Sequence, residues 1–535
     1  MSDIIEIFGK KHTAHGLNFY LTHFDLLAKC LDREHYAFLV GGYVRDRIIG
    51  KPIDKSVDVD LVTTQEPITV ANRFKELLLQ TYDIKADVFE FEKKEPWIKR
   101  NKIATIIFNE GSFKYRFDIA ILKSSGVKSF FGLGQFGFGR PSAEEWEKIL
   151  EKDLKDRDFT CNAIAVNLDD VLSVGAQQTI LFDPTGGIKD LENGIVRPIS
   201  YENLKKDPIR LLRGVRIANE LDFELDEEFL SFLKENHELI KNSAKERISV
   251  EFFKLLRLKN SYKGMEILFE TNAIYSIIPY LEDIKKVSNQ GQHHIYPLDK
   301  HTLKVYEYAE KILENDDINF DKELLDFIKS QIPNYQFLGD FGTKEAIKLS
   351  ALLHDIGKPH TIKIDEKGNV TFYEHDKVGE ELTAKISNEL SFGEELSRFL
   401  QKMVRMHLRI FYLRESLENL TPRAYGKLLR EAEEDIYPLM ILTIADAMGS
   451  KDDDLKMKAL QKTIKNIIEF KLNNVPKHIE PLLSGKEIMN ILNIPEGKTV
   501  GLLKNKLLDL QYEGAIKTKE EAIEWLKKEG ENINT

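Results

Sequence analysis

Cysteine is nearly absent from this chain, which has only Cys30 and Cys161 among 535 residues. Two cysteines provide neither a disulfide framework nor the spacing of a zinc site. Long apolar runs are also missing, since no stretch approaches the roughly 20 apolar residues that span a bilayer. The first residues contain no apolar signal segment. The composition therefore predicts a cytoplasmic protein without a membrane partner.

An excess of positive charge is lacking as well. The 77 lysines and arginines are outnumbered by 88 aspartates and glutamates, which gives a formal net charge of −11. A protein that coats nucleic acid non-specifically usually has the opposite balance, whereas a local basic patch is enough to bind a short RNA end. With 42% hydrophobic and 31% charged residues, the sequence is typical of a soluble globular protein of two to four domains.

The hydrophobic pattern changes near residue 198. Before this point, short apolar runs predict strands interleaved with helical stretches such as 68–80, and the runs are AFLVGG, SVDVDLVTT, KIATIIFN, YRFDIAILK, NAIAVNL and TILFDP. After this point amphipathic helical patterns replace the strands. Polar stretches around 285–295 and 449–454 are plausible boundaries.

Two aspartates share one face of the predicted strand SVDVDLVTT. Because alternate residues of a strand point to the same side, Asp58 and Asp60 project together while the residues between and beside them face the core. Adjacent carboxylates repel each other unless a cation joins them, and Mg²⁺ prefers such oxygen ligands. Pairs of this kind also occur on exposed strand edges that bind no metal.

A glycine pair precedes these aspartates. Gly41 and Gly42 lead from a predicted strand into a helix, where they allow a phosphate to approach the backbone and the free N–H groups of the helix start. Arg45 would add a positive charge. A glycine pair alone more often marks a turn, but in this order with Asp58 and Asp60 it predicts nucleotidyl transfer assisted by two metal ions.

The combination GGYVRD…DVDLVT resembles the signature of the polymerase-β nucleotidyltransferase superfamily, specifically the class II tRNA nucleotidyltransferases and bacterial poly(A) polymerases. The resemblance implies that Asp58 and Asp60 bind two Mg²⁺ ions. It also implies that Asp118, on a separate predicted strand, helps to activate the attacking hydroxyl group. A solvated strand face is the alternative explanation for Asp118.

Two further segments extend the resemblance. DLKDRDFTCNAIAVNL resembles the motif R-R-D-F-T-x-N-A, which implies that Arg157 contacts the triphosphate or ribose. DPTGGIKDLENGIVRPI resembles the strand pair that closes the head domain of the family. Asp156 stands where the family has its leading arginine, so one positive charge is missing beside the expected triphosphate.

An aspartate and three arginines are spaced three residues apart in KKDPIRLLRGVRIA, namely Asp207, Arg210, Arg213 and Arg216. Neighbours at this spacing lie about 60° apart around a helix. The segment resembles the E-D-x-x-R motif, which implies that Asp207 and Arg210 hydrogen-bond the incoming base. Arg213 and Arg216 would then reach the nucleotide and its phosphates. Lys206 stands where the family has glutamate, and Asp207 before a proline is also a frequent helix start.

Seven of the thirteen histidines fall between residues 293 and 407. The segment LSALLHDIGKP ends in an adjacent histidine and aspartate, and the order of the surrounding residues resembles the H…HD…H…H…D pattern of HD-domain metal phosphohydrolases. The resemblance implies ligands for a divalent metal of unspecified identity: His301, His354, Asp355 and Asp446 for a first ion, His375 and His407 for a second. Each histidine taken alone is more often a surface or core residue. The known targets of this family are phosphate esters and 2′,3′-cyclic phosphates.

The resemblance covers nearly the whole chain and implies an α+β fold. We expect a polymerase-β-like nucleotidyltransferase head of mixed sheet and helices at 17–197. An all-helical remainder would comprise a neck with the base-recognition helix at 198–280, an HD body at 285–450 and a tRNA-binding tail at 475–535. In the tail, Lys486, Lys498, Lys504 and Lys506 are candidates for contact with RNA phosphates.

The implied function is that of a template-independent tRNA nucleotidyltransferase. It would add C, A or both to the tRNA 3′ end from CTP and ATP by two-metal phosphoryl transfer. Addition of CC only, of A only, or of poly(A) to general RNA are alternatives within the class. Two alternatives come from other classes: an HD phosphohydrolase whose head holds RNA, and a non-catalytic RNA-binding protein. The sequence predicts no oligomeric state.

Overall fold

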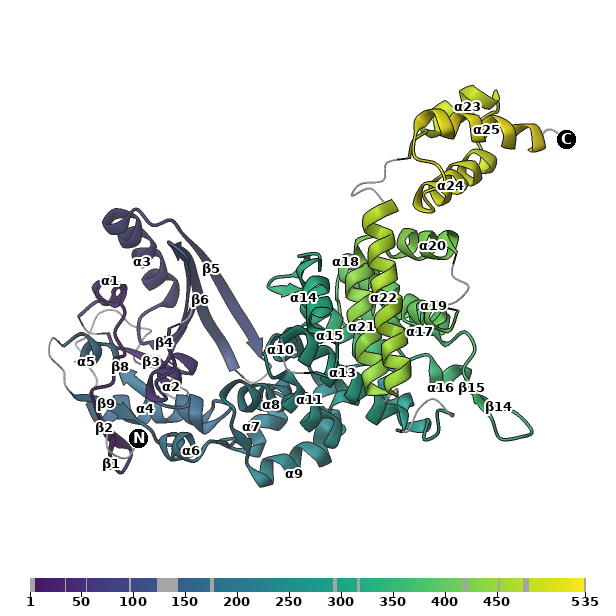
Figure 1. Cartoon of the computed structure of the whole chain (residues 1–535). Coiled ribbons are helices and arrows are strands. Elements are labelled where there is room, and N and C mark those ends of the chain that lie inside the picture. Colours follow the sequence, from purple (N-terminus) through teal and green to yellow (C-terminus); the bar gives the residue numbers. More distant parts are fainter. Residues whose placement is uncertain are drawn as a thin grey trace. The chain divides into compact units, whose positions relative to one another are not determined.

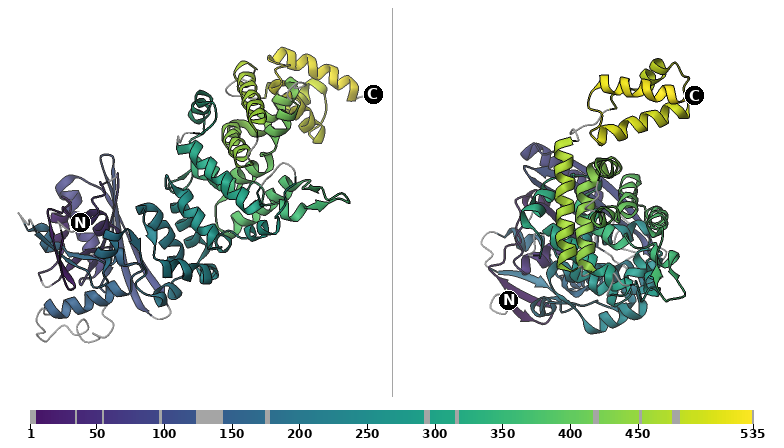
Figure 2. Two further views of the ribbon diagram at one scale, coloured as in Figure 1. Left: turned by 60° about the horizontal axis from the view of Figure 1, so that its bottom comes forward. Right: turned by 45° about the vertical axis from the view of Figure 1, so that its right-hand side comes forward.

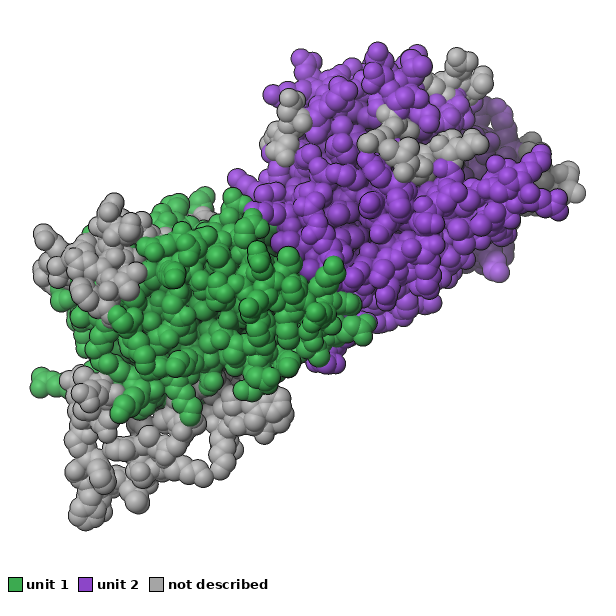
Figure 3. Space-filling model, turned by 90° about the horizontal axis from the view of Figure 1, so that it is seen from below, with its two compact units in different colours: residues 1–239 green, residues 240–535 purple. Residues whose placement is uncertain are grey.

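The computed structural model describes residues 5–33, 35–53, 55–95, 98–122, 143–173, 178–291, 296–314, 318–416, 421–450, 453–474 and 481–533. The chain divides into two compact units, Met1–Leu239 and Ile240–Thr535, shown in green and purple in Figure 3. Within the described ranges, a helix with the length and hydropathy of a membrane span is not found.

The first unit is built on one nine-stranded mixed sheet (Figure 1). Its strands are β1 (Ile5–Phe8), β2 (Lys11–His15), β3 (Ala37–Val40), β4 (Ser56–Thr63), β5 (Ala86–Glu95), β6 (Ile98–Glu110), β7 (Phe113–Ile121), β8 (Ala165–Asn167) and β9 (Gln178–Phe182). Their order across the sheet is β1-β2-β9-β8-β3-β4-β7-β6-β5. The pair β4 and β7 is parallel, and the other neighbouring strands are antiparallel.

The two faces of this sheet are covered differently. Helix α3 (Pro67–Tyr82) lies along β5 and β6 on one face (Figure 1), where the ring of Phe74 packs 5.3 Å from that of Phe117. Helix α4 (Ala143–Lys155) covers part of the other face, and its Leu150 and Leu154 join a cluster with Val62. Burial of these apolar side chains, at about 25 cal/mol per Å², holds both helices on the sheet.

Short helices follow and interrupt the strands of the first unit. These are α1 (Phe24–Lys29), α2 (Gly42–Ile48), α5 (Leu168–Leu172), α6 (Gly187–Asn193), α7 (Tyr201–Lys206), α8 (Ile209–Leu221) and α9 (Glu227–Asn236). A two-stranded parallel pair, β10 (Ile195–Val196) and β11 (Glu224–Leu225), brings the segments before α7 and after α8 together.

Helix α8 carries the arginine series and packs tightly. Leu211, Leu212 and Val215 are fully buried, as a helix with one apolar side requires. At Gly214 an added Cβ would lie 2.7 Å from the ring of Phe159 and 2.6 Å from another ring, so only glycine fits. The helix begins at Ile209, later than the sequence suggested. Asp207 still belongs to the end of α7, because its backbone N–H donates to the carbonyl oxygen of Asn203.

The second unit is almost entirely helical, and Figure 2 shows it from two directions. Its longer helices are α10 (Lys245–Leu256), α11 (Ser261–Glu270), α13 (Leu298–Glu314), α14 (Lys322–Ser330), α15 (Thr343–Leu353), α17 (His375–Glu389), α18 (Glu394–Met406), α20 (Pro422–Ala432), α21 (Ile436–Gly449), α22 (Asp454–Asn474), α23 (Gly485–Leu492), α24 (Lys498–Tyr512) and α25 (Lys519–Ile533). Shorter ones are α12 (Ile274–Ile277), α16 (Lys358–Thr361) and α19 (Arg409–Glu415). Helix α21 is buried along nearly its whole length and packs against α13 and α15.

The expected fold class is confirmed: a mixed-sheet head is followed by helical regions. Two small hairpins, β12 (Gln336–Leu338) with β13 (Phe341–Gly342) and β14 (Lys363–Ile364) with β15 (Val370–Thr371), interrupt the helices. Helices α23–α25 enclose a small apolar core of their own.

Candidate active sites

Three carboxylates lie on one face of the head sheet. In β4, Asp58 and Asp60 are exposed and alternate with buried apolar residues. Strand β7 runs parallel beside β4, and Asp118 is the direct partner of Asp60 in the register. Partner residues of neighbouring strands point to the same side. The structure therefore brings all three aspartates together.

Burial, and then repulsion between the carboxylates, disfavours ionisation of this group. Desolvation raises the pKa of Asp60 to about 6, and the charges of Asp118 and Asp58 add to this rise while Arg157 opposes it. Asp60 is an exposed residue, yet protein groups surround its carboxylate. The backbone of Gly41 lies so close that a Cβ there would be 2.5 Å from Oδ2 of Asp60. Crowded, mutually repelling oxygens fit a hard divalent cation, which would offset the repulsion.

Asp118 has two partners that fix its orientation. The hydroxyl group of Thr105 on β6 donates to Oδ1 over 2.5 Å, and Nε of Arg116 lies 3.0 Å from Oδ2. Thr105 is buried, and Arg116 precedes Asp118 by two residues on the same face of β7. The carboxylate is thus held between two strands beside Asp60.

The glycine pair and the arginine after it shape the neighbouring wall. Gly41, at φ 76°, has a backbone conformation that side chains rarely adopt, and Gly42 is the first residue of α2. Arg45 is buried, with 5% exposure, and its Nη1 donates to Oδ1 of Asn162 over 3.1 Å. Its Nη2 lies 3.6 Å from Glu220. In this structure Arg45 links α2 to the neighbouring turn and to α8.

Arg210 fastens α8 to the turn that contains Arg157. Its Nη1 donates to the backbone carbonyls of Asp156 and Arg157, each over 3.1 Å. Its Nε lies 3.7 Å from Oδ2 of Asp207. The structure therefore joins two segments that are about fifty residues apart in sequence, and the charge of Arg157 acts on the carboxylate of Asp60.

The other two arginines of α8 have acidic partners that the sequence did not assign. Arg213 contacts the buried Asp158 over 3.2 Å. Burial opposes ionisation of Asp158, but Arg213 and Arg210 hold its pKa below the usual range. Arg216 pairs with Glu220 over 2.7 Å. The spacing of four residues on one helix is the signal that could have revealed Glu220, whereas the partner of Asp158 is set by tertiary packing.

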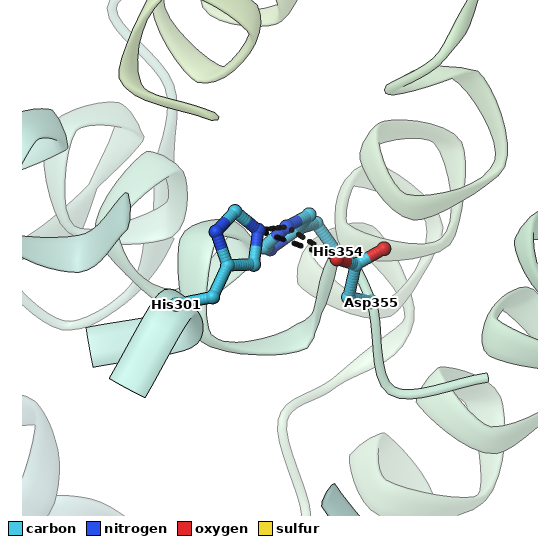
Figure 4. A group of neighbouring side chains, drawn as sticks. All are labelled: His301, His354 and Asp355. Carbon is cyan, nitrogen blue, oxygen red and sulfur yellow. Dashed lines mark hydrogen bonds and ion pairs between the residues drawn. The ribbon is translucent and has the colours of Figure 1, made fainter. Parts of the chain in front are cut away.

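Six potential metal ligands converge in the second unit. His301 lies on α13, His354 and Asp355 follow α15, His375 begins α17, His407 follows α18, and Asp446 lies on α21. All six residues are buried, with 6% exposure or less. Figure 4 shows His301, His354 and Asp355 pointing toward one another. The helices thus bring together every residue that the HD pattern predicted as a ligand.

Asp355 lies between two histidine pairs. Its Oδ2 is 3.4 Å from Nε2 of His301 and 3.1 Å from Nε2 of His354. Its Oδ1 is 3.3 Å from Nε2 of His375 and 3.5 Å from Nε2 of His407. Within each pair the two Nε2 atoms are 3.2 Å apart. The two oxygens of one carboxylate therefore serve two separate groups.

The chemistry of these donors fits metal ions. Nδ1 of His354, His375 and His407 lies 2.7–2.9 Å from the carbonyl oxygen three residues earlier, which directs Nε2 toward the cluster. Ligands that are about 2.1 Å from one ion lie about 3.0–3.5 Å from each other. The observed separations fall in this range, as does the 3.3 Å between Nε2 of His301 and Oδ1 of Asp446.

The carboxylates of the cluster are held in their ionised form. Burial raises the pKa of Asp355, but Lys358 and His354 lower it well below its ordinary value. Nζ of Lys358 lies 2.7 Å from Oδ2 of Asp355 and donates to Oε1 of Gln290 over 2.9 Å. Burial likewise opposes ionisation of Asp446, whose pKa its histidine neighbours lower. Ionised carboxylates are the form that binds metal.

Known family models match three parts of the chain in order. The poly A polymerase head domain matches residues 37–197, and the probable RNA and SrmB-binding site of polymerase A matches 222–285. The HD domain matches 298–449. Both the nucleotidyltransferase and the HD domains typically use divalent metals, in agreement with the two donor sets.

Two curated proteins are similar along about 70% of the chain. An A-adding tRNA nucleotidyltransferase of Deinococcus radiodurans is 28% identical over 380 residues, which is 70% of this chain and 78% of the relative. A CC-adding tRNA nucleotidyltransferase of Thermus thermophilus is 28% identical over 390 residues, with 71% and 77% covered.

Solved structures share the fold. A CCA-adding enzyme in complex with ATP has a TM-score of 0.55 at 19% identity, with 95% of this chain and 94% of that chain covered. The CCA-adding enzyme of Thermotoga maritima, complexed with tRNA, has a TM-score of 0.51 at 17% identity, with 94% and 98% covered.

The fold, the three aspartates and the matched head domain define a nucleotidyltransferase of the poly(A) polymerase type. More narrowly, the chain belongs to the family of tRNA nucleotidyltransferases and bacterial poly(A) polymerases that carry an HD domain.

Proposed function

We propose that the protein adds C, A or both to the 3′ end of tRNA, using CTP and ATP, in the cytoplasm. The observation that carries this proposal is the grouping of Asp58, Asp60 and Asp118 on one sheet face beside Gly41. Three carboxylates can bind metal ions, and the glycine turn at the start of α2 beside them can bind the phosphates of a triphosphate.

In the proposed reaction each aspartate has a separate task. Asp58 and Asp60 would hold Mg²⁺, which when bound neutralises charge on the triphosphate and makes the primer hydroxyl group more acidic. Asp118, held by Thr105 and Arg116, would accept the proton of the 3′-hydroxyl group. The hydroxyl oxygen then attacks the α-phosphorus, and pyrophosphate leaves.

The positive side of the site is formed by α8 and the turn attached to it. Arg157 would offset the charge of the triphosphate and of the leaving pyrophosphate. Asp207 and Arg210 would read the edge of the base, since a carboxylate accepts from an exocyclic amine and a guanidinium donates to ring acceptors. Arg213 and Arg216 support this role by holding α8 through Asp158 and Glu220.

The choice of base is decided by an extension assay. Purified protein is given Mg²⁺ and labelled CTP or ATP with a tRNA that ends at the discriminator nucleotide, at C, or at CC. Extension of all three identifies CCA addition, extension of the first two or the last alone identifies a CC-adding or A-adding enzyme, and long products from ATP identify a poly(A) polymerase. No extension with Asp58 and Asp60 intact would refute the transferase proposal.

A second activity is proposed for the HD body, because Asp355 joins two histidine pairs in a donor set suited to two metal ions. We infer hydrolysis of phosphate esters, 2′,3′-cyclic phosphates included, with a divalent metal as cofactor. The test is release of phosphate or opening of a cyclic phosphate by the Asp58→Ala, Asp60→Ala variant, which removes the first activity. The activity should depend on added Mn²⁺, Ni²⁺ or Mg²⁺ and disappear in His354→Ala.

A further inference from the structure

The catalytic face of the head sheet extends beyond the three aspartates onto two more strands. Phe89 of β5 pairs with Thr105 of β6, Thr105 pairs with Asp118 of β7, and Asp118 pairs with Asp60 of β4. Residues paired in this way across a sheet form one row on one face. Neighbouring strands are about 4.8 Å apart, so Phe89 lies about 10 Å from Asp118 along this row.

The alternation of burial agrees with this placement. Val88 and Ala86, the neighbours of Phe89 on the other face of β5, are partly or fully buried on the side of α3. Phe89 itself is 47% exposed, which is unusual for a phenylalanine in the interior of a strand. Its ring therefore lies on the same face as the carboxylates, in one row with Asp118 and Asp60 but two strands away from Asp118.

Charged and apolar side chains share this face with the ring: the exposed Asp87 lies beside it on β5, and two basic residues lie two strands away on β7. Lys114 and Arg116 of β7 are both exposed, and Arg116 pairs with Asp118. Ile107 of β6 pairs with Arg116 in the next row and is partly exposed. Phe89, Ile107, Lys114 and Arg116 together define the β5–β7 surface. An aromatic ring with neighbouring cations on an open sheet is the arrangement that binds single-stranded nucleic acid, with a base stacked on the ring and phosphates on the cations.

The position of the aspartates decides which nucleic acid segment this surface would meet. Strand β3, which leads into Gly41 and α2, pairs with β4 on the side opposite β7, and Arg45 of α2 contacts Glu220 of α8. The proposed triphosphate position at Gly41 is thus on one side of Asp60, and Asp118 is on the other. The hydroxyl group that loses its proton to Asp118 must belong to the RNA. The β5–β7 surface continues outward from Asp118, so it is adjacent to the RNA end and not to the nucleoside triphosphate.

We propose that the β5–β7 surface binds the single-stranded 3′ end of the RNA primer, with Phe89 stacked on one of its terminal bases and Lys114 and Arg116 beside its phosphates. This inference rests on the proposed transferase function and names the residues that hold its RNA substrate. Stacking is tolerant of base identity, so one ring serves a primer whose last base changes as the end grows.

Steady-state kinetics of full-length variants test the stacking role. Phe89→Ala should raise the KM for tRNA by about tenfold, in line with the loss of one base–aromatic stack, and leave the KM for CTP and ATP unchanged. Phe89→Trp should restore the wild-type KM. Tyr82→Ala is the matched control: Tyr82 is 45% exposed at the end of α3, on the covered side of the sheet. An unchanged KM for tRNA in Phe89→Ala, or equal effects of both alanine variants, would overturn the proposal.

A binding measurement separates this inference from the transferase proposal, because it needs no turnover. In Phe89→Trp, a tRNA that ends at the discriminator nucleotide should quench the added tryptophan fluorescence, measured against the background of the three native tryptophans. A tRNA whose single-stranded end has been removed should not. Quenching in a protein that extends no primer would support RNA binding by the β5–β7 surface and refute only the transferase proposal. Failure of quenching in an active enzyme would refute RNA binding by the β5–β7 surface. A lower molecular mass in solution for Phe89→Ala than for the wild type would also refute it, because the surface would then be a contact between two copies of the chain.

Discussion

Asp60 on β4 and Asp118 on β7 are direct partners in a parallel strand pair, although 57 residues separate them in the chain. Most neighbouring strands of this sheet run antiparallel, so the pair depends on the long excursion through α3, β5 and β6. The excursion also supplies Thr105, whose hydroxyl group binds Asp118. One supersecondary unit thus provides two aspartates and the group that orients one of them.

Replacement of Gly41 by alanine should abolish nucleotide addition. The new Cβ would lie 2.5 Å from Oδ2 of Asp60 and would displace that carboxylate. Gly50→Ala is the matched control, because Gly50 has nearly the same φ, 72°, but its Cβ would meet no atom within 4 Å. Both residues have a positive φ, so a loss of extension in both variants would contradict a specific role for the contact with Asp60.

Thr105→Val should lower kcat for nucleotide addition by about tenfold, since one hydrogen bond that orients Asp118 is lost. The KM for CTP and ATP should stay the same, because Thr105 contacts neither nucleotide nor metal in the proposed site. Thr105→Ser, which keeps the hydroxyl group, should recover the rate. The measurement is kcat at saturating nucleotide over a range of pH. Equal kcat values for Thr105→Val and Thr105→Ser would contradict this role.

Asp60 should make the stability of the metal-free protein depend on pH. Its pKa rises from 3.8 to about 6 on folding, so the folded state binds the proton more tightly than the unfolded state. The free energy of unfolding therefore falls as the pH rises through this window, and it stays at the lower value above pH 6. Asp60→Asn should unfold at a higher temperature than the wild type above pH 6 and at a similar temperature near pH 4.

Thermal unfolding in the presence of EDTA measures this difference. Asp83→Asn, at an exposed aspartate that ends α3, is the control and should follow the wild type at every pH. If the unfolding temperatures of the wild type and Asp60→Asn changed with pH in the same way, the raised pKa of Asp60 would be contradicted. Addition of Mg²⁺ should reduce the difference, because a bound cation favours the ionised form.

Metal content should report the double role of Asp355. Elemental analysis of the purified protein should find up to two divalent ions per chain, one per chain in His375→Ala, and little metal in Asp355→Ala. His360→Ala is the control, since His360 lies near the cluster in sequence but pairs with Asp283 over 3.3 Å. Equal metal content in the Asp355 and His360 variants would disprove the shared site.

The sequence predicted most of what depends on local periodicity. Alternation in SVDVDLVTT located β4 and the face of Asp58 and Asp60, and the strongly apolar runs located β3, β6 and β7. Strand β5 was not predicted, because its alternating charges resemble an exposed loop. An edge strand with one partner tolerates such charges and uses them to prevent aggregation.

Contacts between distant segments were beyond a sequence-based prediction. Arg45 was expected at the phosphates, and in the structure it contacts the adjacent Asp46 and also Asn162 and Glu220, which lie more than a hundred residues away. The order of the HD residues predicted which side chains come together, but the division of the two oxygens of Asp355 between two pairs follows only from the packing of four helices, α13, α15, α17 and α18.

The close fit of Gly214 against Phe159 has a consequence for how one protein could select between two bases. Phe159 adjoins the turn of Arg157, and Arg210 ties the same turn to α8. Helix α8, proposed to recognise the base, and the turn of Arg157, proposed to face the phosphates, therefore form a single rigid unit. Under the proposed function, a switch from cytosine to adenine would require rotation of side chains on this unit, because α8 cannot slide without breaking the contact of Gly214 with Phe159.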